Sequence, residues 1–88
     1  MIERDGVVVN SLGMHARPAA QVVRLASRFK SAIELLHDGQ SVNGKSIMGV
    51  MTLAAECGAT VRVRADGEDE EAAVTALLEL IAQGFGET

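Results

Sequence analysis

The chain has 88 residues, with twelve acidic and eight basic side chains and a formal net charge of −4 at pH 7. This length accommodates one small core, so we expect a single domain over residues 1–88 and chemistry at the surface rather than in a deep cleft. The acidic balance, with two Phe and neither Trp nor Tyr, argues against a nucleic-acid-binding protein. Phosphate contacts need cations, and base stacking needs aromatic rings.

No apolar run reaches membrane-spanning length, and the sequence shows no signal-peptide pattern. We therefore expect a cytoplasmic protein without membrane contact. The single cysteine, Cys57, cannot form an internal disulfide, which fits that compartment. We interpret it as a small buried hydrophobic residue.

The first third of the chain predicts a strand followed by an amphipathic helix. Residues 2–9 end in three valines, which favour a strand but leave its inward face undecided. Residues 10–13 form a loop, and a helix over about 16–29 follows. Its inward face carries Ala19, Val22, Val23, Ala26 and Phe29, and its outward face carries a basic stripe of Arg17, Gln21, Arg24 and Arg28.

The rest of the chain predicts a hairpin, a short helix, a strand and a last helix. Asp38-Gly39 is a strong turn signal between strands at 32–37 and near 40–43. A short helix starts after Ser46, in a segment that Gly58 ends, and a strictly alternating strand follows at 60–65. The last helix opens with the acidic turn at 67–71 and stops near Gly84, and its apolar face is Val74, Leu77, Leu78 and Ile81. This order predicts an α+β domain whose helices cover one face of a mainly antiparallel sheet.

The segment GMHARPAA at 13–20 is the candidate site for chemistry. Pro18 suits the first turn of a helix, so His15 lies at a helix N-terminus, where backbone N–H groups and the helix dipole favour anions. Arg17 adds a guanidinium that binds phosphate oxygens in a bidentate manner. Because imidazole is an effective nucleophile near neutral pH, this arrangement indicates transient phosphorylation of His15. The small Ala16 and Ala20 would leave the ring uncrowded.

Each feature of this segment also has an ordinary explanation. A histidine at a helix start is often only a capping or surface residue, and the basic stripe is equally an ordinary solvated helix face or a docking surface for an acidic partner.

His37 has no acidic or imidazole partner at metal-ligand spacing, so we interpret it as a solvent-facing strand-end residue without chemistry.

The segment NGKSIMGVM at 43–51 carries a second candidate site. Helix capping alone explains Ser46. Ile47, Met48 and Met51 cannot all point inward from a short helix interrupted by Gly49, so we expect at least one or two of them to be exposed as an adaptable contact surface.

With these two segments and the late GEDE at 67–70, the chain resembles the HPr family, the histidine-containing phosphocarriers of the bacterial phosphoenolpyruvate-dependent phosphotransferase system. The resemblance spans nearly the whole chain. It implies an open-faced β-sandwich with four strands in the order 1-4-2-3 and three helices on one side.

The resemblance also implies a function for several residues. Enzyme I, charged by phosphoenolpyruvate, would phosphorylate Nδ1 of His15, and a IIA-type protein would remove the group for sugar uptake. Arg17 would stabilise the phosphoryl group, with no metal and no cofactor. The implied docking surface is Ala20, Arg24, Ile47, Met48 and Met51. Ser46 resembles the site of an HPr kinase/phosphorylase, which makes a transcription regulator a further possible partner. The protein would be a monomeric carrier, not an enzyme.

Two other functions stay open at this stage. The same His15 relay would serve a regulatory branch, either nitrogen-related or controlling transcription, in place of sugar transport. A small ligand-binding domain with an incidental histidine is the remaining hypothesis.

Overall fold

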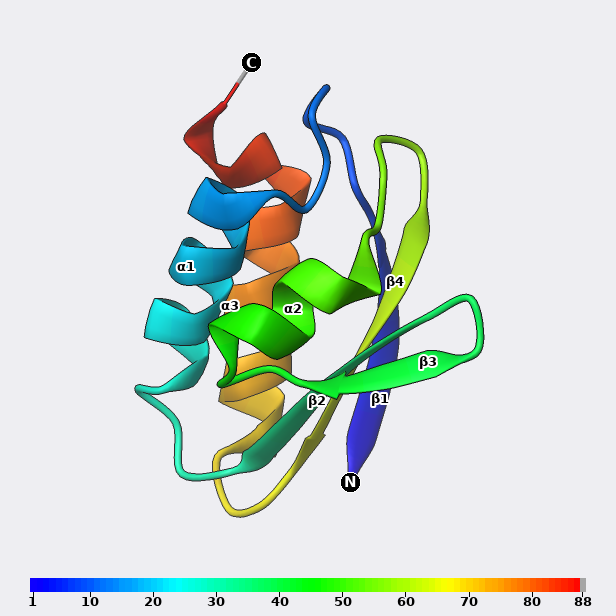
Figure 1. Ribbon diagram of the computed structural model, residues 1–88. Coiled ribbons are helices and arrows are strands. Elements are labelled where there is room, and N and C mark those ends of the chain that lie inside the picture. The colour runs from blue at the N-terminus through cyan, green and yellow to red at the C-terminus, as the bar shows by residue number, and fades with distance from the viewer. Residues whose placement is uncertain (88) are drawn as a thin grey trace.

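The computed structural model describes residues 1–87 and has an α+β architecture, with three helices on one face of a four-stranded sheet (Figure 1). The elements in chain order are β1 (Ile2–Val7), α1 (Ala16–Ala26), β2 (Ala32–His37), β3 (Gln40–Asn43), α2 (Ile47–Leu53), β4 (Thr60–Asp66), α3 (Glu70–Ala82) and a short 3-10 turn, η1 (Gly84–Gly86).

The strands lie in the order β1-β4-β2-β3, and all three pairings are antiparallel. Val7 of β1 lies opposite Thr60 of β4, and Leu35 of β2 lies opposite Val63 of β4. The open-faced sandwich and the strand order expected from the resemblance are therefore confirmed.

The core lies between the sheet and the helices. Alternation along β2 and β4 turns every second side chain toward the helices, where Leu35 and Val63 are fully buried against Leu77 of α3 and the rest of the core. The opposite face of the sheet is charged. There Arg62 pairs with Asp5 at 2.9 Å and Arg64 with Glu3 at 3.0 Å, so this face is stable in water without a covering layer.

Two features near the ends of strands differ from the predictions: the last residue of β1 and the exposure of Cys57. β1 ends at Val7 rather than at residue 9, and only Val8 of the three valines is buried, with its N–H bonded to Ala59 O at 2.9 Å. Cys57 is exposed, which contradicts its interpretation as a buried residue. Cys57 lies in a tight turn before Gly58. Ala55, two residues earlier, is the residue of this loop that packs into the core.

The helices are shorter than the sequence predicted. α1 ends at Ala26, not near 29, because Arg28 and Phe29 form tighter bonds to carbonyls three residues back, and Lys45 Nζ holds Phe29 O at 2.8 Å. α2 ends at Leu53, because the next residue adopts a left-handed conformation. α3 begins at Glu70, three residues later than expected. Among residues 1–87, no helix combines the length and apolarity that crossing a bilayer requires.

Asp69 precedes α3, and its side chain makes no capping bond to that helix. It stabilises another part of the chain instead. Its carboxylate accepts hydrogen bonds from Lys30 N at 2.8 Å, from Ser31 N at 2.9 Å and from the Ser31 hydroxyl, which fixes the turn between α1 and β2. These donors, the Ser31 hydroxyl first, lower the pKa of Asp69 from 3.8 to about 2.

We expect Asp69→Asn to lower the melting temperature by a few degrees at pH 7, because one carboxylate oxygen would become an NH2 group that faces a backbone N–H, and the charge of the acceptor would be lost. The contribution of Asp69 is fully present above its unfolded pKa and is lost as pH falls toward its folded pKa of about 2. The difference between variant and parent should therefore shrink between pH 4 and pH 2 in thermal melts. Glu68→Gln is the matched control, since Glu68 is exposed and its ion pair within residues 1–87 is with Lys30 at the surface. A difference in melting temperature between Asp69→Asn and the parent that stays constant with pH would contradict this role of Asp69.

Candidate functional site

His15 is the N-cap residue of α1, as the sequence predicted. Its backbone is extended (φ −90°, ψ −167°), its carbonyl accepts from Ala19 N at 2.9 Å, and its imidazole makes no capping bond. Pro18 lies in the first turn and has no N–H. The amides of Ala16 and Arg17 are therefore the first-turn donors left without an intrahelical acceptor, directly beside the half-exposed imidazole.

The loop before α1 is clamped against the loop between α2 and β4. Gly13 has φ +68°, and a Cβ at this position would lie only 2.6 Å from Ala55 O. The next residue, Met14, is buried and donates its N–H to the same carbonyl at 2.8 Å. Only glycine fits here, so the position of His15 is set by tight backbone packing on both sides of the loop.

A carboxylate near the C-terminus contacts the imidazole. Both oxygens of Glu87 lie close to His15 Nε2, Oε1 at 3.0 Å and Oε2 at 2.9 Å. The buried Asn10 donates from Nδ2 to Glu87 Oε1 at 3.0 Å and to Gly13 O at 2.8 Å. Neither Glu87 nor Asn10 was predicted from the sequence as a site residue. The only signal was the Gly-Phe-Gly pattern at 84–86, which is typical of a tight turn that buries an apolar residue.

Glu87 is held in its ionised form. The hydrogen bond from His15 lowers the pKa of Glu87 most, Asn10 and the positive charge of Arg17 lower it further, and partial burial opposes them. The carboxylate is thus an acceptor at neutral pH. A carboxylate without a proton can contact Nε2 favourably only if that nitrogen carries the hydrogen.

Arg17 lies on the exposed side of α1 and has no ion pair or hydrogen bond among residues 1–87. Its side chain therefore has free donors two residues along the chain from His15, and its charge acts on Glu87. Of the predicted basic stripe, Arg24 and Arg28 are also exposed, whereas Gln21 is half-buried and donates to Phe85 O at 3.0 Å. Gln21 thus ties the C-terminal turn to α1.

Ser46 caps α2, as predicted. Its Oγ accepts the N–H of Gly49 at 3.1 Å, and the side chain is half-buried. The exposed contact surface predicted after Ser46 is present: Ile47 is 45% exposed, Met48 75% and Met51 41%. All three residues face outward from a helix that packs against α1.

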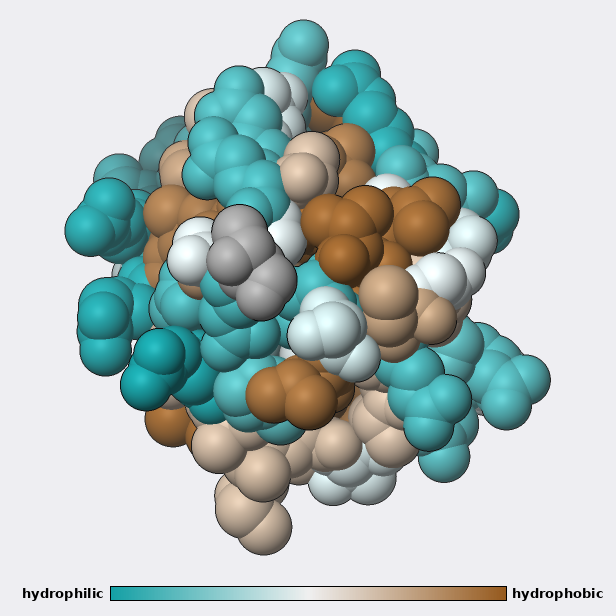
Figure 2. All heavy atoms as spheres, turned by 90° about the horizontal axis from the view of Figure 1, so that it is seen from above, coloured by the Kyte–Doolittle hydropathy of each residue, from teal (hydrophilic) through white to brown (hydrophobic). Residues whose placement is uncertain are grey.

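The end of the molecule at which α1 begins also carries exposed apolar side chains. Figure 2 shows brown and tan side chains interrupting the hydrophilic surface at this end. Leu12, in the loop before His15, is 74% exposed, and Ala20 of α1 is half-buried. The sequence analysis did not single out Leu12, because a lone leucine in a loop has no periodic pattern that would show its orientation.

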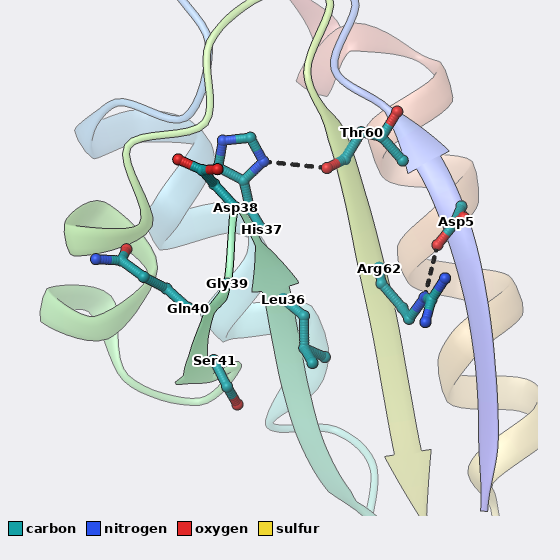
Figure 3. Close-up of a pocket in the computed structure, with 9 residues that line it drawn as sticks. All are labelled: Asp5, Leu36, His37, Asp38, Gly39, Gln40, Ser41, Thr60 and Arg62. Atoms are coloured by element: carbon teal, nitrogen blue, oxygen red, sulfur yellow. Dashed lines mark hydrogen bonds and ion pairs between the residues drawn. The ribbon is translucent and has the colours of Figure 1, made fainter.

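A separate hollow lies on the helix-free face of the sheet, around the turn between β2 and β3 (Figure 3). His37 lines it and directs Nδ1 toward Thr60 O at 3.1 Å, and the Arg62–Asp5 ion pair lies across from it. None of the residues around His15 lines this hollow. The place of His37 at a strand end is confirmed, and its half-buried side chain makes this hydrogen bond at the exposed surface. Residues 1–87 hold no cluster of three His, Cys, Asp or Glu suited to a metal ion.

Comparison with known families agrees with this geometry. A family model described as the PTS HPr component phosphorylation site matches residues 2–83. The chain belongs to the HPr family. It is 49% identical to the phosphocarrier protein HPr of Cupriavidus necator over 99% of this chain and 98% of that protein. It is 51% identical to HPr of Xylella fastidiosa with the same coverage.

Solved HPr structures share the fold. HPr from Thermoanaerobacter tengcongensis superposes with a TM-score of 0.95 at 46% identity, covering 100% of this chain and 99% of that one. Crh of Bacillus subtilis, a catabolite repression HPr described as a swapped dimer, superposes with a TM-score of 0.77 at 42% identity, covering 96% and 97%. The chain is accordingly a phosphocarrier protein of the phosphotransferase system and not an enzyme.

Proposed function

We propose that His15 accepts a phosphoryl group on Nδ1 from Enzyme I and passes it to a IIA-type protein in sugar uptake. The observation that carries this proposal is the contact between Glu87 and Nε2 of His15 at 2.9 Å and 3.0 Å. With Nε2 bonded, Nδ1 is the ring nitrogen with a lone pair for attack on phosphorus.

The groups around Nδ1 suit a phosphoryl group in transfer. Its oxygens carry spread negative charge, and the Arg17 guanidinium together with the first-turn amides of α1 would neutralise part of it. In the first transfer, the lone pair of Nδ1 forms the new bond to phosphorus while the bond from phosphorus to the donor atom breaks and its electron pair returns to the donor. In the onward transfer, a lone pair of the acceptor attacks phosphorus, the Nδ1–phosphorus bond breaks and its electron pair returns to Nδ1. The exposed site gives both donor and acceptor proteins access to the same atom.

Incubation with Enzyme I and labelled phosphoenolpyruvate tests this function. We expect stoichiometric, acid-labile label on the chain and its transfer to a sugar-specific IIA protein added afterwards. Label that never reaches the chain, or that stays on it when IIA is added, would contradict the carrier role.

The docking surface proposed for both partners combines α1 and α2. Arg24 supplies charge for an acidic partner, Ala20 leaves room for close approach, and Ile47, Met48 and Met51 supply adaptable apolar contact. Such an exposed apolar group rimmed by charge is typical of a protein interface.

We propose further that phosphorylation of Ser46 by a kinase regulates this docking. Phosphate at the start of α2 adds a charge of about −1.5 to −2 beside the exposed methionines, where an acidic partner would have to approach it. The same charge is favourable to the helix itself, so the fold should be retained.

We expect Ser46→Asp to raise the KM for phosphorylation by Enzyme I on the order of tenfold, equal to about 1.4 kcal/mol, with kcat little changed. Added salt should relieve part of the effect, and the melting temperature should be unchanged or slightly raised. Thr75→Asp adds the same charge on the exposed side of α3 and serves as the control. Equal KM values for the two variants, or a Ser46→Asp protein that is unfolded, would remove the case for a switch.

A regulatory branch is the second candidate function, favoured by the similarity to Crh and by the accessible Ser46. The two are separated by the acceptor: transfer to sugar-specific IIA proteins supports transport, and transfer only to soluble regulatory IIA proteins, or binding of the Ser46-phosphorylated form to a transcription regulator, supports regulation. We also propose that the carrier acts as a cytoplasmic monomer. A sedimentation mass of two chains would contradict the monomer, since some solved relatives are dimers.

A further inference from the structure

We propose that Glu87 is a positioning residue for phosphoryl transfer, holding the His15 ring with its hydrogen on Nε2 and balancing the positive charge that the ring acquires. This inference rests on the proposed function and adds a residue to it. The carboxylate contacts Nε2 through both oxygens, at 3.0 Å and 2.9 Å, with its side chain 19% exposed.

The contact with Glu87 first decides the tautomer of the His15 ring. Glu87 is ionised at neutral pH, because its bonds to His15 and Asn10 lower its pKa. An ionised carboxylate only accepts hydrogen bonds, so the hydrogen of a neutral ring lies on Nε2 and the lone pair on Nδ1. The contact thus selects the nucleophilic atom as well as the orientation of the ring.

The second step is the charge balance of the transfer. When the Nδ1 lone pair forms the bond to phosphorus and the donor atom keeps the electron pair of the broken bond, the Nε2 hydrogen stays in place. The ring then carries a positive charge that it did not have before. A carboxylate already seated on Nε2–H stabilises this charge as it develops, as the buried aspartate does for the imidazolium of a catalytic triad. In the onward transfer the ring leaves as neutral imidazole, with the same hydrogen retained.

The third step is the support of Glu87 itself. Asn10, 2% exposed, donates one amide hydrogen to Glu87 Oε1 and the other to Gly13 O, so it links the carboxylate to the loop that carries His15. Phe85 is 3% exposed and its carbonyl accepts from Gln21 of α1. Figure 1 shows the C-terminal turn beside the start of α1. The tail is thus fixed at two points before it reaches the ring.

Two variants and one control test this role. Glu87→Ala removes the acceptor, Glu87→Gln keeps an acceptor without charge, and Glu71→Gln removes one exposed acid at the other end of α3. In the parent and the control, NMR of ¹⁵N-labelled protein should show a His15 Nε2–H signal in slow exchange with water, and Glu87→Ala should lose it. With Enzyme I, kcat should fall on the order of tenfold for Glu87→Ala, with KM unchanged and Glu87→Gln intermediate.

The outcomes separate this inference from the proposed function. The NMR readout needs no phosphoryl donor, so a parent protein that shows the Nε2–H signal but takes no phosphate would defeat the proposed function alone. A Nε2–H signal unchanged in Glu87→Ala, or a kcat equal to that of the parent, would overturn the role of Glu87. Amide spectra and melting temperatures of the variants, compared with Glu71→Gln, show whether a lost rate reflects only lost folding.

Discussion

Replacement of His15 by alanine is expected to reduce labelling from phosphoenolpyruvate and Enzyme I to background. The imidazole is the nucleophile in the proposed transfer, and alanine leaves the first-turn amides and Arg17 with no atom that can bond to phosphorus. The fold should persist, because His15 is half-exposed and its backbone, not its side chain, forms the start of α1.

The control for this prediction is His37→Ala. His37 lies at the end of β2, not at a helix N-terminus, and its Nδ1 is bonded to Thr60 O. The variant should be labelled as fast as the parent. Phosphate on a His15→Ala protein, or loss of label in His37→Ala with the fold intact, would place the acceptor elsewhere.

Arg17→Ala is expected to lower kcat for transfer by about 10²-fold, the usual cost of removing one preorganised group that stabilises transferring charge. Arg17→Lys should fall between the parent and Arg17→Ala, because lysine keeps the charge but loses the planar fork that fits two phosphate oxygens. Melting temperatures should change little, since the side chain is exposed and makes no hydrogen bond or ion pair among residues 1–87.

Stopped-flow or quenched-flow labelling at saturating Enzyme I separates this effect on the chemical step from any effect on docking. Arg28→Ala is the matched control, because Arg28 is exposed just beyond the other end of α1. Equal kcat values for Arg17→Ala, Arg17→Lys and Arg28→Ala would show that the guanidinium near His15 plays no part in the transfer.

Local patterns were sufficient for most of the fold. The Asp38-Gly39 turn and the alternation at 60–65 predicted their strands, and Pro18 predicted the start of α1. Element ends were predicted less well, because they depend on contacts between distant segments. α1 stops at Ala26 in part because Lys45 donates a hydrogen bond to the carbonyl of Phe29. Lys45 lies sixteen positions after Phe29 in the sequence. Cys57 was placed in the core on its chemistry alone, whereas a tight turn exposes it.

The residues of the candidate site also fall into those that the sequence predicted and those that it did not. His15, Arg17 and Ser46 lie in short motifs, so their positions at helix starts could be read from neighbouring residues. Glu87 could not, because it meets His15 across 72 positions and depends on a C-terminal turn with three successive left-handed residues at 84–86. Asn10 was unremarkable as a loop residue and gains its role only when the tail folds back onto it.

The central claim is that phosphorus bonds to Nδ1 of His15, and NMR of the phosphorylated carrier tests it most directly. The ¹⁵N-labelled chain is phosphorylated with Enzyme I and phosphoenolpyruvate, and the one-bond coupling between ³¹P and ring ¹⁵N is recorded. The account predicts a single coupled nitrogen, Nδ1 of His15, with the hydrogen still on Nε2 beside Glu87. Coupling to Nε2 of His15, to a nitrogen of His37, or to no ring nitrogen at all would contradict it.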